Sequence, residues 1–260
     1  MFARILLATV FFVIGVRIHS MVEQLKTRMD PYRGIKQKAS AKCSAFSDHE
    51  LHDHKLASSN NKQSKPTVTL LLGASGAGKG QYYKQYLSGL DLPLHGLDEY
   101  LVFSKEYKTL FEDEYFIYES AAEECYPSII NLAKKRLDDL IRLNASFVYE
   151  ETGKDQKRMS KLVNRFRDAG YEIDAVIVRS NINTSVIRAK TRFLETGRFA
   201  SEEYVRASEP FPLIKPTLIS LGVRTVTECQ NDCMQSITNF GVTAVSAAIQ
   251  FDCLVCSNRL

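Results

Sequence analysis

A glycine-rich loop between a short apolar strand and a helix is the feature that most constrains this chain. Residues 67–72 (TVTLLL) are mainly β-branched and aliphatic, which is typical of a strand buried in a parallel sheet. The glycines after this strand let the backbone curl so that several N–H groups point at one phosphate, and the N-terminus of the following helix adds a favourable dipole. The loop therefore predicts a P-loop, the nucleotide-binding element found between a strand and a helix. Its residues, all expected to bind the cofactor, are Gly73, Ala74, Ser75, Gly76, Ala77, Gly78, Lys79 and Gly80.

The end of the loop predicts which cofactors are used. Lys79 places a cation where negative charge develops on the β- and γ-phosphates during phosphoryl transfer, so ATP is expected. Gly80 stands where a serine or threonine normally contacts Mg²⁺, and Gln81 follows it. We still expect Mg²⁺ as the second cofactor, held more by water and acidic side chains. The sequence does not identify the metal ligands.

Beyond the loop, strands alternate with helices. This order predicts an α/β fold of the P-loop NTPase type, with a parallel sheet and helices on both of its faces. The predicted helices cover residues 119–143, 157–169, 183–195 and 235–250, and the further strands cover residues 147–149, 173–178 and 223–227.

Composition agrees with one soluble domain plus extensions. The chain has 260 residues, of which 45% are hydrophobic and 25% charged. Its formal net charge of +4 is too weak to indicate nucleic-acid binding, so a small-molecule substrate is expected. We divide the chain into a hydrophobic signal or anchor segment (1–20), a polar linker (21–65) and a kinase domain (66–260).

An apolar run near the amino terminus bears on location. Residues 5–16 (ILLATVFFVIGV) have the length of a signal-peptide core and are short for a membrane span of about 20 residues. If the run is kept as an anchor, the lysines and arginines after it place the kinase domain in the cytosol, and we expect this membrane-associated arrangement. The alternative is a secretory or secreted protein whose signal is cleaved before Met21. Two sequons, beginning at Asn144 and Asn183, would be glycosylated only in a secretory lumen.

The cysteines allow more than one interpretation. Four of them lie near the carboxyl end as C-x₃-C and C-x₂-C pairs, which could hold zinc or form disulfides. We prefer scattered thiols, because no histidine follows Cys229 and the spacing matches no common zinc module.

A kinase also needs groups on the acceptor side. Asp98 could accept the proton of an attacking hydroxyl, or it could simply cap a helix. Glu150 and Thr152 follow the strand at 147–149, where ligands of parallel sheets bind, and could hold substrate hydroxyls or Mg²⁺. Arg192 and Arg198 could supply cations around the transferred phosphoryl group.

The order of these motifs, over residues 67–205, resembles the zeta toxin family of kinases, whose bacterial members phosphorylate UDP-N-acetylglucosamine. Gly73 to Lys79 is similar to the family's P-loop, and Leu97-Asp98-Glu99-Tyr100 is similar to its Asp-Thr-Phe element. The resemblance implies that Asp98 is the catalytic base, that Glu150 and Thr152 bind substrate, and that Arg192 and Arg198 are the catalytic arginines. Gly170-Tyr171-Glu172 is similar to the Gly-Tyr-Glu that opens the family's next strand.

This chain also departs from the family. Gly80 replaces a hydroxyl residue and Glu151 replaces a glycine. We therefore expect an ATP-dependent kinase that phosphorylates a hydroxyl of a small substrate, with a UDP-sugar as one candidate. Two alternatives stay open: a nucleotide or polynucleotide-end kinase, and a membrane-tethered ATP-binding module without catalysis. The sequence does not indicate protein partners, a toxin role or an oligomeric state.

Overall fold

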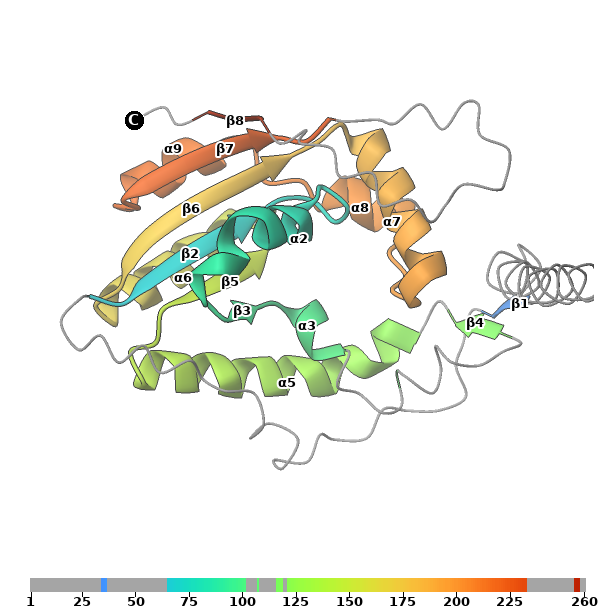
Figure 1. Ribbon diagram of the computed structural model, residues 1–260, viewed down its shortest axis with the longest axis horizontal. Coiled ribbons are helices and arrows are strands. Elements are labelled where there is room, and N and C mark those ends of the chain that lie inside the picture. Colours follow the sequence, from blue (N-terminus) through green and yellow to red (C-terminus); the bar gives the residue numbers. More distant parts are fainter. Residues whose placement is uncertain are drawn as a thin grey trace, which may run out of the picture.

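The predicted alternation of strands and helices produces a central sheet with helices packed on it (Figure 1). The computed structural model describes residues 34–36, 65–101, 107, 116–118, 121–232 and 255–257. The strands within these residues are β1 (Gly34–Lys36), β2 (Thr67–Leu72), β3 (Leu94–His95), β4 (Phe116–Tyr118), β5 (Phe147–Glu151), β6 (Glu172–Arg179), β7 (Thr225–Gln230) and β8 (Val255–Ser257). The α-helices are α2 (Lys79–Tyr82), α3 (Leu97–Leu101), α5 (Ala121–Arg142), α6 (Gln156–Asp168), α7 (Ile182–Thr196), α8 (Glu202–Ala207) and α9 (Ile214–Ser220). A π-helical segment, η2 (Tyr83–Leu87), and a 3-10 turn, η3 (Ser88–Leu90), follow α2.

The central sheet has the strand order β3-β5-β2-β6-β7-β8. Every pair from β3 to β7 is parallel, whereas β8 is antiparallel to β7. β1 and β4 form a separate parallel pair. Because parallel strands end at the same edge of a sheet, the segments after β3, β5, β2 and β6 all emerge on one side. The predicted P-loop NTPase-type α/β fold is confirmed, with an antiparallel edge strand added to it.

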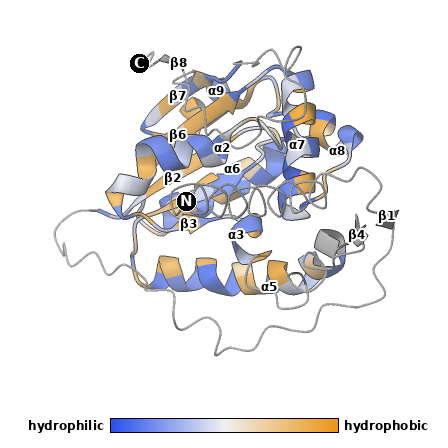
Figure 2. Cartoon of the chain, turned by 45° about the vertical axis from the view of Figure 1, so that its right-hand side comes forward, coloured by the Kyte–Doolittle hydropathy of each residue, from blue (hydrophilic) through white to orange (hydrophobic). Residues whose placement is uncertain are grey.

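Side chains of strand β2 alternate between the two faces of the sheet. Leu70 and Leu72 share a buried cluster with Phe166 of α6, while Leu71 shares a second cluster with Tyr82 of α2. All three leucines are 0% exposed, and burying each one fully stabilises the fold by about 1.5–3 kcal/mol. Figure 2 shows hydrophobic colour along the central strands and mixed colour on the surrounding helices. The core thus consists of two layers that hold β2, and with it the glycine-rich loop, in place.

Most predicted elements occur with small changes in their ends. The strand predicted over residues 223–227 is instead Thr225–Gln230, because Val223 N still donates a hydrogen bond to Leu218 O (3.1 Å) and so closes the turn after α9. The helix predicted over residues 235–250 lies outside the described residues. So do the segment 1–20 and most of the predicted linker 21–65, within which only β1 and Lys65 are described.

The preference for scattered thiols among the four carboxyl-terminal cysteines is wrong for Cys229, the one of them whose side chain is described. Cys125 of α5 and Cys229 of β7 are both disulfide-bonded and 0% exposed. The antiparallel pairing of β8 with β7 places Cys256 in register with Cys229, a relation between distant segments that residue spacing does not reveal. Within the described part of the chain, no group of three or more metal-ligating side chains occurs, and no helix is long and apolar enough to cross a membrane.

Candidate active site

The predicted site residues meet at the carboxyl edge of three neighbouring strands. The glycine-rich loop follows β2, Glu150 lies near the end of β5, and Asp98 lies in α3, directly after β3. These strands are adjacent in the order β3-β5-β2. Open parallel sheets bind their ligands at this edge, so the topology brings together residues that are far apart in the sequence.

The loop has the backbone geometry that its glycines allow. Gly76 and Gly78 have φ angles of 83° and 101°, which side chains rarely adopt. A Cβ atom at Gly76 would lie 2.2 Å from the carbonyl oxygen of Ser185, so this position also lacks space for a side chain. Gly78 is the N-cap residue of α2, so the loop leads directly into a helix N-terminus. This arrangement suits an anion such as a nucleotide phosphate.

Lys79 is held at the base of the loop. Its Nζ donates hydrogen bonds to Gly73 O (2.8 Å) and Ala74 O (3.1 Å), and lies 3.6 Å from Glu150 Oε1. The residue is 8% exposed. Burial lowers the pKa of Lys79 below its ordinary value, and the Glu150 carboxylate partly offsets this. The ammonium is thus poised between the loop carbonyls and a carboxylate of the neighbouring strand.

The two consecutive glutamates at the end of β5 have different partners. Glu150 is in register with Leu71 of β2 and pairs with Lys79. Glu151 accepts hydrogen bonds from the N–H (3.0 Å) and the hydroxyl (3.2 Å) of Thr152, and pairs with Arg158 of α6 at 2.7 Å. Successive side chains of a strand point to opposite faces of the sheet. Glu150 therefore faces the P-loop, while Glu151 orders the turn that carries Thr152.

Asp98 lies inside the first turn of α3 rather than before it. Its Oδ1 accepts a hydrogen bond from the Tyr126 hydroxyl of α5 (3.1 Å), and its Oδ2 pairs with Arg198. Burial raises the pKa of Tyr126 to about 12, so its hydroxyl stays a donor at neutral pH. The carboxylate is therefore oriented by two donors from other elements, and its side chain does not act as a helix cap.

The two predicted arginines come from α7 and the segment after it. Arg192 donates a hydrogen bond to Ser75 Oγ in the P-loop (3.1 Å), and Arg198 follows Gly197, whose φ of 70° ends the helix. Burial lowers the pKa of Arg198 to about 10, which still leaves the guanidinium charged at neutral pH. The buried Nε atoms of both arginines have no hydrogen-bond partner among the described residues. Both side chains thus keep donor capacity, that of Arg192 beside the phosphate-binding loop and that of Arg198 beside Asp98.

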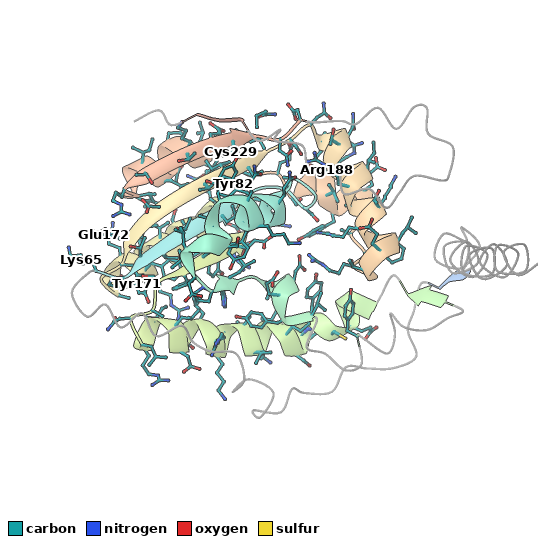
Figure 3. The ribbon with its side chains drawn as sticks, viewed as in Figure 1. Lys65, Tyr82, Tyr171, Glu172, Arg188 and Cys229 are labelled. Atoms are coloured by element: carbon teal, nitrogen blue, oxygen red, sulfur yellow. The ribbon has the colours of Figure 1, made fainter. Side chains whose placement is uncertain are left out.

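Three further residues of the site were not predicted from the sequence. Tyr126 orients Asp98, although nothing distinguishes it from other tyrosines in the sequence. Asn231 is 1% exposed and donates from Nδ2 to Ala77 O (3.0 Å), while Arg188 of α7 donates to Asn231. Figure 3 labels Arg188 on α7. Asn231 directly follows the last parallel strand, so its place at the carboxyl edge could have been inferred by the rule that located Glu150.

Comparisons with known proteins agree with this fold. The profile of the family described as Zeta toxin matches residues 52–209, more than half of the chain. A solved structure from the PezAT chromosomal toxin–antitoxin system of Streptococcus pneumoniae is similar, with a TM-score of 0.54 and 18% identity over 71% of this chain and 79% of that chain. Two structures of the AvrRxo1-ORF1:ORF2 complex are also similar. The one with sulphate ions has a TM-score of 0.54 and 11% identity over 65% of this chain and 56% of that chain. The one with ATP has a TM-score of 0.51 and 11% identity over 65% and 55% of the two chains. At these identities, the structural likeness shows the fold. The comparison with curated proteins gives no match.

Proposed function

We infer the reaction of this chain from one premise: it belongs to the zeta toxin family. Membership of that family and the P-loop geometry make it an ATP-dependent kinase. We propose that the acceptor is a hydroxyl group of a UDP-sugar such as UDP-N-acetylglucosamine. One observation carries the hydroxyl acceptor: a doubly oriented carboxylate, Asp98, lies at the same edge of the sheet as the phosphate-binding loop. The choice of a UDP-sugar rests on the resemblance to the family's bacterial members.

In the proposed reaction, the substrate hydroxyl attacks the γ-phosphorus of ATP. A bond forms between the hydroxyl oxygen and phosphorus, the bond from phosphorus to the β–γ bridging oxygen breaks, and ADP leaves. Asp98 accepts the hydroxyl proton, and Tyr126 and Arg198 orient its carboxylate. Lys79 and Arg192 stabilise the charge on the transferred group, because both lie on or against the P-loop.

The residues around the loop also fit Mg²⁺. Burial and the nearby Glu150 carboxylate raise the pKa of Glu99, which indicates two carboxylates facing the same region. Mg²⁺ takes oxygen ligands and is usually held by one or two carboxylates together with substrate phosphates. Glu150 lies near the end of the strand beside β2, where P-loop NTPases place their metal-binding carboxylate, and we propose that it holds the ion. The ion would neutralise charge on the phosphates.

Substrate binding is assigned to the turn after β5. Glu150 and Thr152, which the family resemblance assigns to substrate, flank Glu151, and Glu151 fixes the turn through Thr152 and Arg158. A fixed turn suits a substrate rich in hydroxyls, because each hydroxyl needs a placed acceptor or donor. Glu151 replaces the family's glycine at this point, so it is the position at which sugar preference would differ.

The alternative of a polynucleotide-end kinase receives less support. Basic residues that a polynucleotide could contact lie on or beside α6, but Arg158 pairs with Glu151 and Arg165 pairs with Asp138. Lys154 places its ammonium 4.9 Å from the centre of the Tyr204 ring. Positive charge that is already paired contributes less to phosphate binding. The non-catalytic alternative conflicts with the assignment of the chain as a phosphotransferase.

The test is phosphoryl transfer by the purified full chain with γ-labelled ATP, Mg²⁺ and a panel of UDP-sugars, free sugars, nucleosides and oligonucleotides. We expect label on a UDP-sugar, with Asp98→Asn inactive and Lys157→Ala unchanged as an exposed control on α6. Label on an oligonucleotide or nucleoside alone would refute the proposed acceptor while leaving the kinase assignment in place. No label on any acceptor, with ATP still bound, would refute the proposed substrate class.

A further inference from the structure

We propose that this kinase domain matures in the oxidising lumen of a secretory pathway, where Asn144 accepts an N-linked glycan. Three independent observations on this chain support the proposal. They are the disulfide bonding of Cys125 and Cys229, the surface geometry of the sequon at Asn144, and the apolar run at residues 5–16.

The disulfides bear on the compartment. Cytosolic thiols are kept reduced, whereas disulfides form and persist in the secretory lumen and outside the cell. Cys125 and Cys229 lie in two different clusters of buried residues, one with α3 and α5 and the other around β2 and α2. Both cysteines of the chain whose side chains the structure describes are bonded, so oxidation involves both sides of the fold.

Both oxidised cysteines stand close to site residues along the chain. Cys125 immediately precedes Tyr126, which donates its hydroxyl hydrogen bond to Asp98. Cys229 lies two positions before Asn231, which donates to the carbonyl of Ala77 in the P-loop. The oxidised cysteines therefore lie in the segments that orient the base and support the loop.

The sequon at Asn144 lies in an exposed turn that hydrogen bonds hold in place. Asn144 is exposed, with φ of 51°, in the turn between α5 and β5. The turn is fixed by Tyr171, whose hydroxyl donates to Leu140 O (3.1 Å) and Ala145 O (2.9 Å). The Ser146 hydroxyl accepts a hydrogen bond from Thr67 N (3.0 Å). An asparagine side chain on a fixed and exposed turn can carry a glycan without displacing packed atoms.

The second sequon is less suited to a glycan. Asn183 is also exposed, but its Oδ1 accepts a hydrogen bond from Arg206 of α8 (2.9 Å). It lies in the first turn of α7, and the hydroxyl of Ser185, the third residue of that sequon, is bonded to Ser180 inside the fold. A glycan on the amide nitrogen of Asn183 would crowd the Arg206 side chain that donates to Oδ1 of the same amide, so we assign the modification to Asn144.

A glycan on Asn144 would lie away from the candidate active site. Asn144 precedes β5, whereas the site follows the carboxyl end of that strand. Figure 3 places Tyr171, which anchors this turn, at the end of the sheet opposite Arg188. The modification would therefore leave nucleotide and substrate binding free.

The apolar run supplies a route to the lumen. Residues 5–16 have the length of a signal-peptide core, with Arg4 before them. The lysines and arginines that follow favour the cytosol for a retained anchor, which is the arrangement expected from charge alone. We prefer the cleaved signal because it accounts for the disulfides, which the cytosolic arrangement does not.

The glycan is tested by expressing the full chain in eukaryotic cells and treating it with peptide N-glycosidase. The enzyme leaves an aspartate where a glycan was attached, so peptide mass spectrometry assigns the position. We expect a mobility shift that is lost in Asn144→Asp and kept in Ser146→Thr and Asn183→Asp. Aspartate tolerates the left-handed backbone at position 144, and Ser146→Thr keeps both the sequon and the hydroxyl. A shift that persists in Asn144→Asp, or no shift in any variant, would overturn the assignment.

The compartment is tested on the same cells by fractionation and by alkylation of thiols in denaturant, before and after reduction, because both cysteines are buried in the folded chain. We expect the chain in the lumenal or secreted fraction, with Cys125 and Cys229 alkylated only after reduction. Recovery of the full-length chain in the cytosol with both thiols already reactive would refute the proposal. Because neither measurement depends on kinase activity, this result is separate from the identity of the acceptor.

Discussion

Gly80 offers a direct test of how the metal is held. An ideal Cβ at this position would meet no heavy atom within 4 Å, and the residue is exposed in α2 without a positive φ. A larger side chain therefore fits without strain. Glycine in a helix is about 0.8–1 kcal/mol less favourable than alanine, with serine between them. We expect Gly80→Ala to raise the free energy of unfolding by up to about 1 kcal/mol and Gly80→Ser by about half of that.

The functional effect should separate the two variants. Gly80→Ser restores the hydroxyl that usually contacts Mg²⁺ in a P-loop, and one added polar contact contributes about 0.5–1.5 kcal/mol. The Mg²⁺ concentration for half-maximal activity should thus fall by roughly 2- to 12-fold at fixed ATP. Gly80→Ala should leave it unchanged, since a methyl group cannot bind the ion.

Two measurements decide the matter. Thermal unfolding should show an increase of about 2–4 °C for Gly80→Ala and of about half that for Gly80→Ser. Initial rates titrated with Mg²⁺ should shift only for serine. Equal Mg²⁺ dependence in both variants would refute the inference that the missing hydroxyl limits metal binding. A drop in melting temperature for alanine would refute the steric argument.

Three other perturbations follow from the site. Lys79→Met should lower turnover by about 10²–10³-fold. Its stability should change little, because the lost bonds to Gly73 O and Ala74 O are offset by removing a charge that burial disfavours. Wild-type turnover in the folded variant would contradict the role of Lys79. In single-turnover transfer, Asp98→Asn should bind ATP but lose about 10²–10⁴-fold in rate. Tyr126→Phe, which removes only a hydrogen bond to Asp98, should lose less than 10-fold. The reverse ranking would mean that Asp98 is not the base. Burial, with Arg136 and Arg165 adding to it, lowers the pKa of His95 from 6.5 to about 4. The unfolded chain therefore binds the extra proton between these values, and stability falls as pH drops, by about 2 kcal/mol from pH 7 to pH 5. In denaturant unfolding, His95→Gln should lack this loss of stability between pH 7 and pH 5. An identical pH dependence of the unfolding free energy in both proteins would contradict the role of His95.

The glycine-rich loop, the fold class and most elements could be predicted because their signals are local. Glycine, lysine and a β-branched strand in direct succession determine a loop of one shape, whatever lies elsewhere in the chain. The alternation of strands and helices then restricts the sheet to a parallel one, since consecutive parallel strands need a crossover helix. Asp98 and Glu150 could be named for the same reason, because each lies at or just after the carboxyl end of a strand.

The pairings within the site were decided by tertiary structure. Asp98 and Arg198 lie 100 positions apart, and Tyr126 reaches Asp98 only because α5 packs beside α3. Which of Glu150 and Glu151 faces the P-loop depends on the register of β5 against β2. Oxidation of Cys229 belongs to the same class, because a disulfide joins segments that meet only in the folded chain. The sequence by itself determines the elements and the chemistry that each can carry, since these depend on neighbouring residues. Which carboxylate meets which cation, and which thiol is oxidised, depends on contacts between distant segments that form only when the sheet and its helices pack together.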